Sequence, residues 1–263
     1  MLSAIACLEG VTAIPRLGGR VPMLVPVAAA LSRYRVGPRS LLRPSSESTG
    51  VFAEAGLTQG FQASLARSAL PADADGLQLD RLHARFVSLR RFSGAPTVAV
   101  KNTASCARVP LLADRFRQAA FVHVVRHPAA VVMSLLRTDF WHGMTLWWDG
   151  RTTQQYAVDE QLSAEAVAAR HWSRQVETAA RDLAGLEPRR VQALRYESFL
   201  EDPWQTLGRL GRLGLTAGET IRARKRVTQL SIRTADPPAV PPEVRAAVEQ
   251  QCPDAARLVG VEL

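Results

Sequence analysis

Hydrophobic and polar residues along the chain are arranged in a pattern typical of an α/β protein. Short apolar runs end in loops and are followed by stretches with helical periodicity, and this alternation recurs three times. Such an order favours parallel strands joined by helical crossovers. The predicted strands cover residues 8–14, 96–100, 120–125 and 190–194.

Two helices are predicted from the positions of apolar residues and helix-ending residues. Residues 120–125 are rich in β-branched side chains, and Pro128 stands just after them, where a helix begins readily, so we expect a helix from Pro128 to about Arg137. A longer helix is predicted over residues 163–183, ended by Gly185. Its apolar face consists of Ala168, Trp172, Val176, Ala179 and Leu183.

The stretch from Asp139 to Tyr156 follows neither a helical nor a strand period, and it is predicted to be a loop or a lid. It contains Trp141, Trp147 and Trp148. Two interpretations of these tryptophans stay open. They form the wall of a ligand pocket, since such pockets favour aromatic side chains, or they pack the lid itself.

Further segments are predicted to be loops that connect the helices and strands. Residues 68–76 and 235–242 are rich in Pro, Ala and Asp and are predicted to run over the surface. Pro22 and Pro26 disfavour a regular helix in the apolar run that starts at Val21, although Pro22 is compatible with a first helical turn.

Composition narrows the class of protein. The chain has 263 residues, 47% of them hydrophobic, so a single domain over residues 1–263 is expected. Its formal charge of +9 indicates an anionic ligand, nucleic acid or an anionic membrane surface. The 3 cysteines are far apart, which argues against a disulfide framework and indicates a reducing compartment. With no long apolar run and no signal-peptide pattern, we expect a cytoplasmic protein.

The most informative motif lies at residues 121–137. The apolar strand predicted there delivers Arg126 directly before a helix, and open α/β sheets bind ligands at the carboxyl ends of their strands. A guanidinium binds phosphate through two parallel hydrogen bonds, and Ser134 lies further along the helix. The motif resembles the 3′-phosphate-binding element of sulfotransferases that use 3′-phosphoadenosine-5′-phosphosulfate (PAPS). Alternatively, Arg126 is a surface charge and Ser134 bonds to its own helix.

A second segment, Leu-Arg-Tyr-Glu-Ser-Phe-Leu-Glu-Asp-Pro at residues 194–203, resembles another element of the same family. The resemblance implies cofactor-binding roles for Arg195 and Tyr196, with the tyrosine near the adenine. Tyr196 offers a flat face for a purine, and Arg195 adds positive charge beside it. The alternative is that Tyr196 belongs to the core and that the acidic residues up to Asp202 cap a helix that begins at Pro203.

Residues 98–103, Val-Ala-Val-Lys-Asn-Thr, resemble the element that follows the middle strand in this family. A lysine at this strand end stabilises charge on the bridging oxygen during transfer, so Lys101 is a catalytic candidate. Thr103 stands where other members have proline or a catalytic histidine, and a histidine base is therefore not implied here. Lys101 as an ordinary solvated lysine is the alternative.

Residues 11–20 occupy the place of the family's loop for the 5′-phosphosulfate, whose backbone N–H groups hold that group. The resemblance implies binding roles for the loop and a catalytic role for its arginine. These loop residues are Arg16, Leu17, Gly18, Gly19 and Arg20. Leu17 replaces a serine, and Gly19 and Arg20 replace two threonines, so a weakened or inactive member is an alternative.

Glu47 is the first candidate for the general base, because many similar sulfotransferases place a glutamate after their first helix, where it takes the acceptor proton. A surface capping role for Glu47 is the alternative. His123 reads as a core histidine. No histidine pair has metal-ligand spacing, so we expect no metal.

The resemblance implies a three-layer, P-loop-like α/β fold with a central parallel sheet of about four to five strands flanked by helices. The implied activity moves a sulfuryl group from PAPS to a hydroxyl or amine of a small-molecule, glycan or lipid acceptor and releases PAP. One alternative is a catalytically inactive, sulfotransferase-like nucleotide-binding protein. Another is a basic nucleic-acid-binding protein, but the chain lacks the regular basic and aromatic patches typical of that class.

Overall fold

The computed structural model describes residues 11–15, 22–31, 48–214 and 239–263. The chain divides into two compact units, each of which is described by itself. The first comprises Met1–Thr58, Ala72–Ser105 and Asp202–Ile232, and the second comprises Gln59–Pro71, Cys106–Glu201 and Arg233–Leu263. In the described part of each unit, helices pack against a pair of parallel strands, so the fold is mixed α/β and rich in helix.

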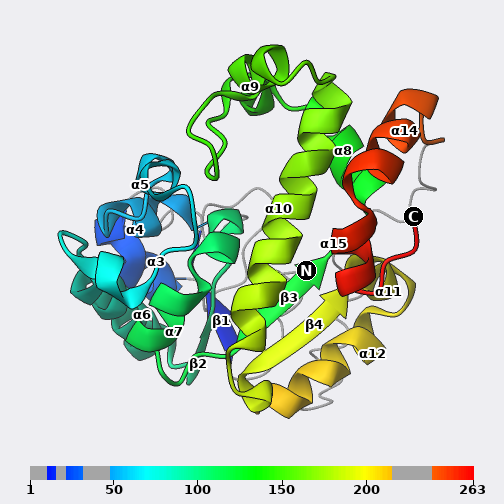
Figure 1. Ribbon diagram of the computed structural model, residues 1–263. Helices are drawn as coiled ribbons and strands as arrows, with labels where there is room; N and C mark the ends of the chain where they lie inside the picture. The colour runs from blue at the N-terminus through cyan, green and yellow to red at the C-terminus, as the bar shows by residue number, and fades with distance from the viewer. Residues whose placement is uncertain (1–10, 16–21, 32–47, 215–238) are drawn as a thin grey trace. The chain divides into compact units, whose positions relative to one another are not determined.

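In the first unit, strand β1 (Val11–Ala13) pairs in parallel with β2 (Thr97–Ala99), with Val11 opposite Thr97 (Figure 1). Helix α6 (Leu79–Ser93) packs against both strands and against α3 (Val25–Leu31). The other described elements of this unit are η1 (Pro22–Leu24), α4 (Thr49–Glu54), α12 (Pro203–Gly208) and η6 (Arg209–Leu213). The chain passes from one unit to the other within two short 3₁₀ helices, which are labelled η2 (Pro71–Ala74) and η3 (Thr103–Ala107).

Helix α6 is amphipathic and packs against α3 and α4. Leu82 and Leu89 are buried on one face, as expected for residues seven positions apart on a helix. On another side Arg85 donates two hydrogen bonds, of 2.9 and 2.6 Å, to the carboxylate of Glu54 in α4. This contact lowers the pKa of Glu54. Gly94 caps the carboxyl end of the helix with a φ of 71°, a left-handed value that suits glycine.

In the second unit, strand β3 (Phe121–Val125) pairs in parallel with β4 (Val191–Arg195), so that Phe121 lies opposite Val191 and Val125 opposite Arg195. Figure 1 shows the two strands side by side with the same direction. The helices of this unit are α5 (Gln59–Leu65), α7 (Val109–Arg115), α8 (Pro128–Leu136), α9 (Thr153–Asp159), α10 (Ala164–Ala184), α11 (Tyr196–Glu201), α14 (Pro242–Gln251) and α15 (Pro253–Leu258), with the short turns η4 (Asp139–Gly143) and η5 (Pro188–Arg190).

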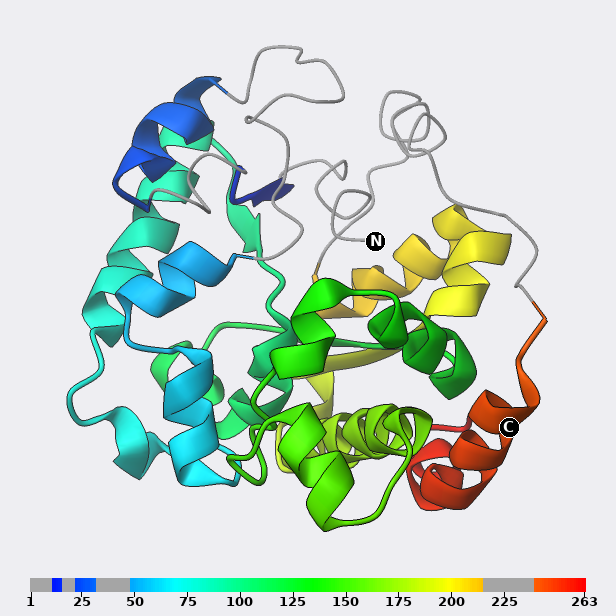
Figure 2. The same cartoon turned by 90° about the horizontal axis from the view of Figure 1, so that it is seen from above.

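Helix α10 is the central element of the second unit. It packs against β3 and against α8, α9, α14 and α15 (Figure 2). Its first turn is capped by Ser163, whose hydroxyl accepts the N–H of Ala166. Trp172 and Val176 are buried on its apolar face, in one cluster with Val132 of α8 and Val248 of α14. Burial of this face on several sides accounts for a helix of this length.

The four predicted strands are confirmed where they fall in the described residues, and both pairings are parallel as expected. The helices predicted from Pro128 and over residues 163–183 are confirmed within one residue at their ends. Whether the two strand pairs belong to one sheet of four to five strands stays a prediction, as does the single domain.

The prediction of a loop or lid over Asp139–Tyr156 is wrong in part, because this stretch contains η4 and the start of α9. The sequence signal that was missed is a capping box. The Thr152 hydroxyl accepts the N–H of Gln155, and the Gln155 side chain accepts the N–H of Thr152. Thr145 also pairs with Thr152 in an isolated bridge. Local hydrogen bonds therefore give the segment a defined conformation.

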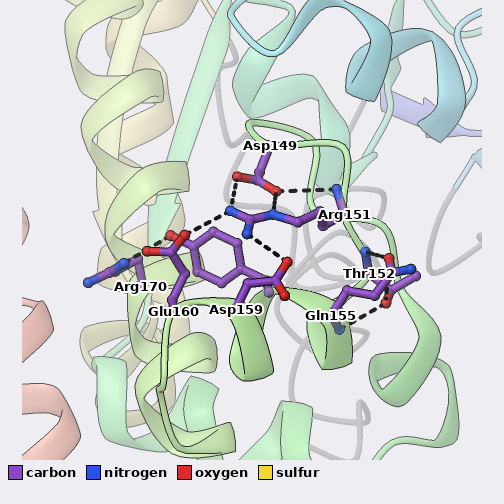
Figure 3. A network of polar contacts seen from close by, with 8 residues as sticks. Asp149, Arg151, Thr152, Gln155, Asp159, Glu160 and Arg170 are labelled. Carbon is purple, nitrogen blue, oxygen red and sulfur yellow. Dashed lines mark hydrogen bonds and ion pairs between the residues drawn. The ribbon is translucent and has the colours of Figure 1, made fainter.

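Figure 3 shows the polar contacts around Arg151 that hold this segment. Its guanidinium donates to Asp149 at 2.7 Å, to Asp159 at 3.0 Å and to Glu160 at 2.9 Å. The same guanidinium lies 4.7 Å from the centre of the Tyr156 ring. Hydrogen bonds to the three carboxylates raise the pKa of Arg151, so its guanidinium is bound to groups of the same segment.

The tryptophans of this segment serve mainly as packing, which is the second of the two interpretations given above. Trp141 and Trp147 are buried, and Trp141 belongs to the main core cluster of the unit. Trp141 and Trp148 each contact the ring of His171 in α10, with ring centres 5.2 Å apart. These rings fill the space between the segment and α10.

The prolines near residue 22 do not prevent a helix, contrary to expectation. Pro22 begins η1 and Pro26 lies in the first turn of α3. Because the N–H groups of a first turn have no partner within the helix, proline loses nothing there. The segment 68–76 is not wholly a surface connection either, since Ala69 is buried and exchanges backbone hydrogen bonds with Ala107 and Leu111.

None of the helices in the described ranges is both long and apolar enough to span a membrane. In those same ranges, no three His, Cys, Asp or Glu side chains are grouped in a way that would hold a metal ion.

His171 makes the stability of the second unit depend on pH. Burial lowers its pKa to about 3, and its Nε2 atom lies 2.7 Å from the Gln175 amide. The unfolded chain binds a proton near pH 6.5, whereas the folded chain does not. Through this group the free energy of unfolding should therefore fall as the pH drops below 6.5, with a slope that rises toward about 1.4 kcal/mol per pH unit and ends near the folded pKa of about 3.

Denaturant unfolding between pH 7.5 and 5.5 measures this slope. In His171→Phe, which keeps a ring against Trp141 but cannot take up a proton, we expect a shallower decline than in the wild type. His123, whose pKa is also lowered by burial, is present in both proteins and adds the same slope to each. Equal slopes in the two proteins would therefore contradict a neutral, buried His171.

Candidate active site

The candidate site lies at the carboxyl ends of β3 and β4. Arg126 directly follows β3, and Tyr196 directly follows β4. Because the strands are parallel and Val125 lies opposite Arg195, these two residues leave the strand pair at the same edge and at the same level. This is the edge at which open α/β sheets bind ligands.

The structure brings the side chains of Arg126 and Tyr196 together. The Cζ atom of Arg126 lies 5.2 Å from the centre of the Tyr196 ring, within the range of a cation–π contact. Arg126 is exposed, and no carboxylate in the described part of the chain pairs with it. Its positive charge is thus available to an anion, and the Tyr196 ring lies next to it.

The helix that follows Arg126 begins with a defined cap. Pro128 occupies the first turn of α8, and the Nδ1 atom of His127 accepts the N–H of Ala129 at 3.2 Å. His127 is thus the N-cap residue of this helix. The amino-terminal end of the helix dipole adds partial positive charge near Arg126.

The peptide group between Arg126 and His127 is bound on both sides. The indole N–H of Trp172 donates to the Arg126 carbonyl at 3.0 Å, and the Glu197 carboxylate accepts the N–H of His127 at 2.8 Å. Sequence reasoning missed both residues, since it placed Trp172 on the buried face of a helix and Glu197 in a capping run. A buried indole N–H does require an acceptor, but the sequence does not say which one.

Ser134 lies in the second turn of α8 and is exposed. In the described residues its hydroxyl makes no hydrogen bond, so the alternative in which it binds a carbonyl of its own helix is not observed. Its hydroxyl is therefore free to bind a ligand.

Arg195 is turned toward another part of the unit. Its guanidinium donates to the carbonyl of Gly260 at 2.8 Å, and its Nε atom lies 3.6 Å from the Glu197 carboxylate. Arg195 thus attaches the end of β4 to the carboxyl-terminal residues. Asp202, by contrast, caps α12 as expected, accepting the N–H groups of Trp204 and Gln205.

Lys101 belongs to the first unit and follows β2. It is exposed, and its carbonyl accepts the N–H of Ser48 at 3.0 Å. Ser48 is the N-cap residue of α4 and directly follows Glu47 in the sequence. The other predicted site residues lie outside the described residues: Glu47, Arg16, Leu17, Gly18, Gly19 and Arg20.

A model of the sulfotransferase family matches residues 26–217, which is well over half of the chain. The chain therefore belongs to the sulfotransferase family, and the resemblance found in its motifs is confirmed at this level. Among solved structures, the sulfotransferase domain from the curacin biosynthetic pathway aligns with 96% of this chain and 97% of its own, at 15% identity and a TM-score of 0.44. No curated protein matches the chain significantly.

The cap of α8 gives a test of the local structure. His127→Ala removes the acceptor of the Ala129 N–H and should lower the free energy of unfolding by about 1 kcal/mol, whereas His127→Asn should restore most of it, since asparagine caps helices well. Denaturant unfolding at neutral pH measures both. If the alanine variant proved as stable as the wild type, the capping bond would have no energetic role.

Proposed function

We propose that the protein transfers a sulfuryl group from PAPS to a hydroxyl or amine of a small-molecule, glycan or lipid acceptor. Membership of the sulfotransferase family supports sulfuryl transfer in general. The observation that carries the choice of PAPS is the contact of Arg126 with Tyr196 at the ends of two paired strands. An available guanidinium beside an aromatic face suits a nucleotide with an additional phosphate on its ribose.

Each binding residue has a role in this proposal. Arg126 and Ser134 bind the 3′-phosphate, and Tyr196 lies against the adenine. Arg195, whose guanidinium is held by Gly260, adds positive charge from nearby. The loop from Arg16 to Arg20 holds the 5′-phosphosulfate through its backbone N–H groups. A three-layer, P-loop-like arrangement with one central sheet of four to five strands belongs to the same proposal.

In the transfer step the acceptor oxygen or nitrogen forms a bond to sulfur while the bond between sulfur and the bridging phosphate oxygen breaks. PAP leaves with the electron pair of that bond. Glu47 takes the acceptor proton, and Lys101 and Arg16 stabilise the negative charge that develops on the bridging oxygen. Alignment of the two substrates supplies much of the remaining rate enhancement.

A thermal-shift experiment tests the nucleotide. PAP should raise the melting temperature of the wild type more than AMP or ATP does, because neither carries a 3′-phosphate. Arg126→Ala should abolish this selectivity and weaken PAP binding at least about tenfold. Arg189→Ala is the matched control, since Arg189 is 79% exposed and precedes the opposite end of β4. Equal shifts with all three nucleotides in the wild type would count against PAPS.

A turnover assay distinguishes an enzyme from an inactive binding protein. The inactive alternative is favoured by Leu17, Gly19 and Arg20, which replace hydroxyl-bearing residues in the phosphosulfate loop. We expect sulfated product from PAPS on a panel of hydroxyl and amine acceptors. Lys101→Ala should lower kcat about a hundredfold while calorimetric titration shows unchanged PAP affinity, because the lysine acts on charge that develops during transfer. PAP binding by the wild type without turnover on any acceptor would support the inactive alternative.

A further inference from the structure

The peptide that joins Arg126 to His127 lies just beyond the hydrogen-bonded strand pair. The last paired residues are Val125 and Arg195, so the following peptide has no strand partner in the described residues. Backbone polar groups that leave a sheet in a protein interior need other partners. Here Trp172 of α10 supplies a donor for the carbonyl, and Glu197 of α11 supplies an acceptor for the N–H.

These two hydrogen bonds determine the orientation of the Arg126 backbone. A peptide group bound at both its carbonyl and its N–H cannot rotate freely, and the direction of the Arg126 side chain depends on that orientation. The bond from His127 to Glu197 is charge-assisted and therefore stronger than a neutral one. Trp172 is 4% exposed, so its N–H has little access to water as an alternative partner.

Glu197 also connects the aromatic part of the candidate site, the Tyr196 ring, with its cationic part, the Arg126 guanidinium. It directly follows Tyr196 in the first turn of α11. The short helix therefore carries both the ring beneath the Arg126 guanidinium and the carboxylate that binds the next backbone N–H. Movement of Glu197 would change the position of Arg126 relative to Tyr196.

We propose that Glu197, together with Trp172, is a positioning residue that holds the Arg126 guanidinium in place for the 3′-phosphate of the sulfuryl donor. Neither residue touches the nucleotide in this proposal. The inference rests on the proposed function, because it assigns the Arg126 contact to a 3′-phosphate. It predicts that loss of either hydrogen bond lowers the preference for a 3′-phosphorylated nucleotide, whereas binding of a nucleotide without that phosphate is unchanged.

The experiment compares the affinities for PAP and AMP by calorimetric titration in the wild type and four variants. In Glu197→Ala the ratio of PAP to AMP affinity should fall about tenfold, with AMP affinity unchanged. Glu197→Gln keeps an oxygen that accepts the His127 N–H, so it should stay within about threefold of the wild type. Glu201→Ala, an exposed glutamate on the same helix, should equal the wild type.

Trp172→Phe tests the other side of the peptide, because it keeps an aromatic ring but removes the N–H donor, and it should lower the same ratio. If Glu197→Ala fails to fold, Trp172→Phe still tests the positioning role. A wild type that binds PAP no better than AMP would refute the proposed function itself. A wild type with clear preference for PAP, together with folded variants that keep the full ratio or lose PAP and AMP affinity equally, would refute the positioning role alone.

Discussion

The parallel pairing of β3 with β4 is the constraint on which the candidate site depends. Since the two strands run in the same direction with Val125 opposite Arg195, the residues that follow them leave at one edge and at one level. That register brings the guanidinium of Arg126 over the ring of Tyr196, although 69 residues separate them in the sequence. A shift of the register by one residue would turn the side chains of the shifted strand to the other face of the sheet and separate the pair.

Helix α10 packs against β3 of this strand pair. It buries one face against α8 and α14 and, through the indole of Trp172, also binds the backbone at the end of β3. The same helix carries His171, which is packed against Trp141 and Trp148 and stays uncharged inside the unit. Core packing and site geometry are therefore linked through neighbouring residues of one helix.

Several arginines of the second unit are bound in structural contacts, and this distinguishes Arg126 from them. Arg195 is bound to Gly260, Arg151 to three carboxylates and Arg190 to backbone carbonyls that include Ala119. Arg126 contacts an aromatic ring, which orients its guanidinium but leaves its hydrogen-bond donors available. A high net positive charge is thus a poor guide to a binding site unless the partners of each residue are known.

The sequence by itself determined the order and type of the main elements, because strand and helix periodicity, Pro128 and the cap at Ser163 act locally. It also determined the family and the choice of Arg126 and Tyr196, since both lie in short motifs next to predicted strand ends. Local signals were misread where a capping box began α9 inside a stretch taken for a loop. Only the tertiary structure decided that Glu197 and Trp172 hold the Arg126–His127 peptide and that Arg195 binds Gly260. Those contacts join residues far apart in the chain, and a hydrogen-bond donor in the sequence carries no record of the acceptor that folding brings to it.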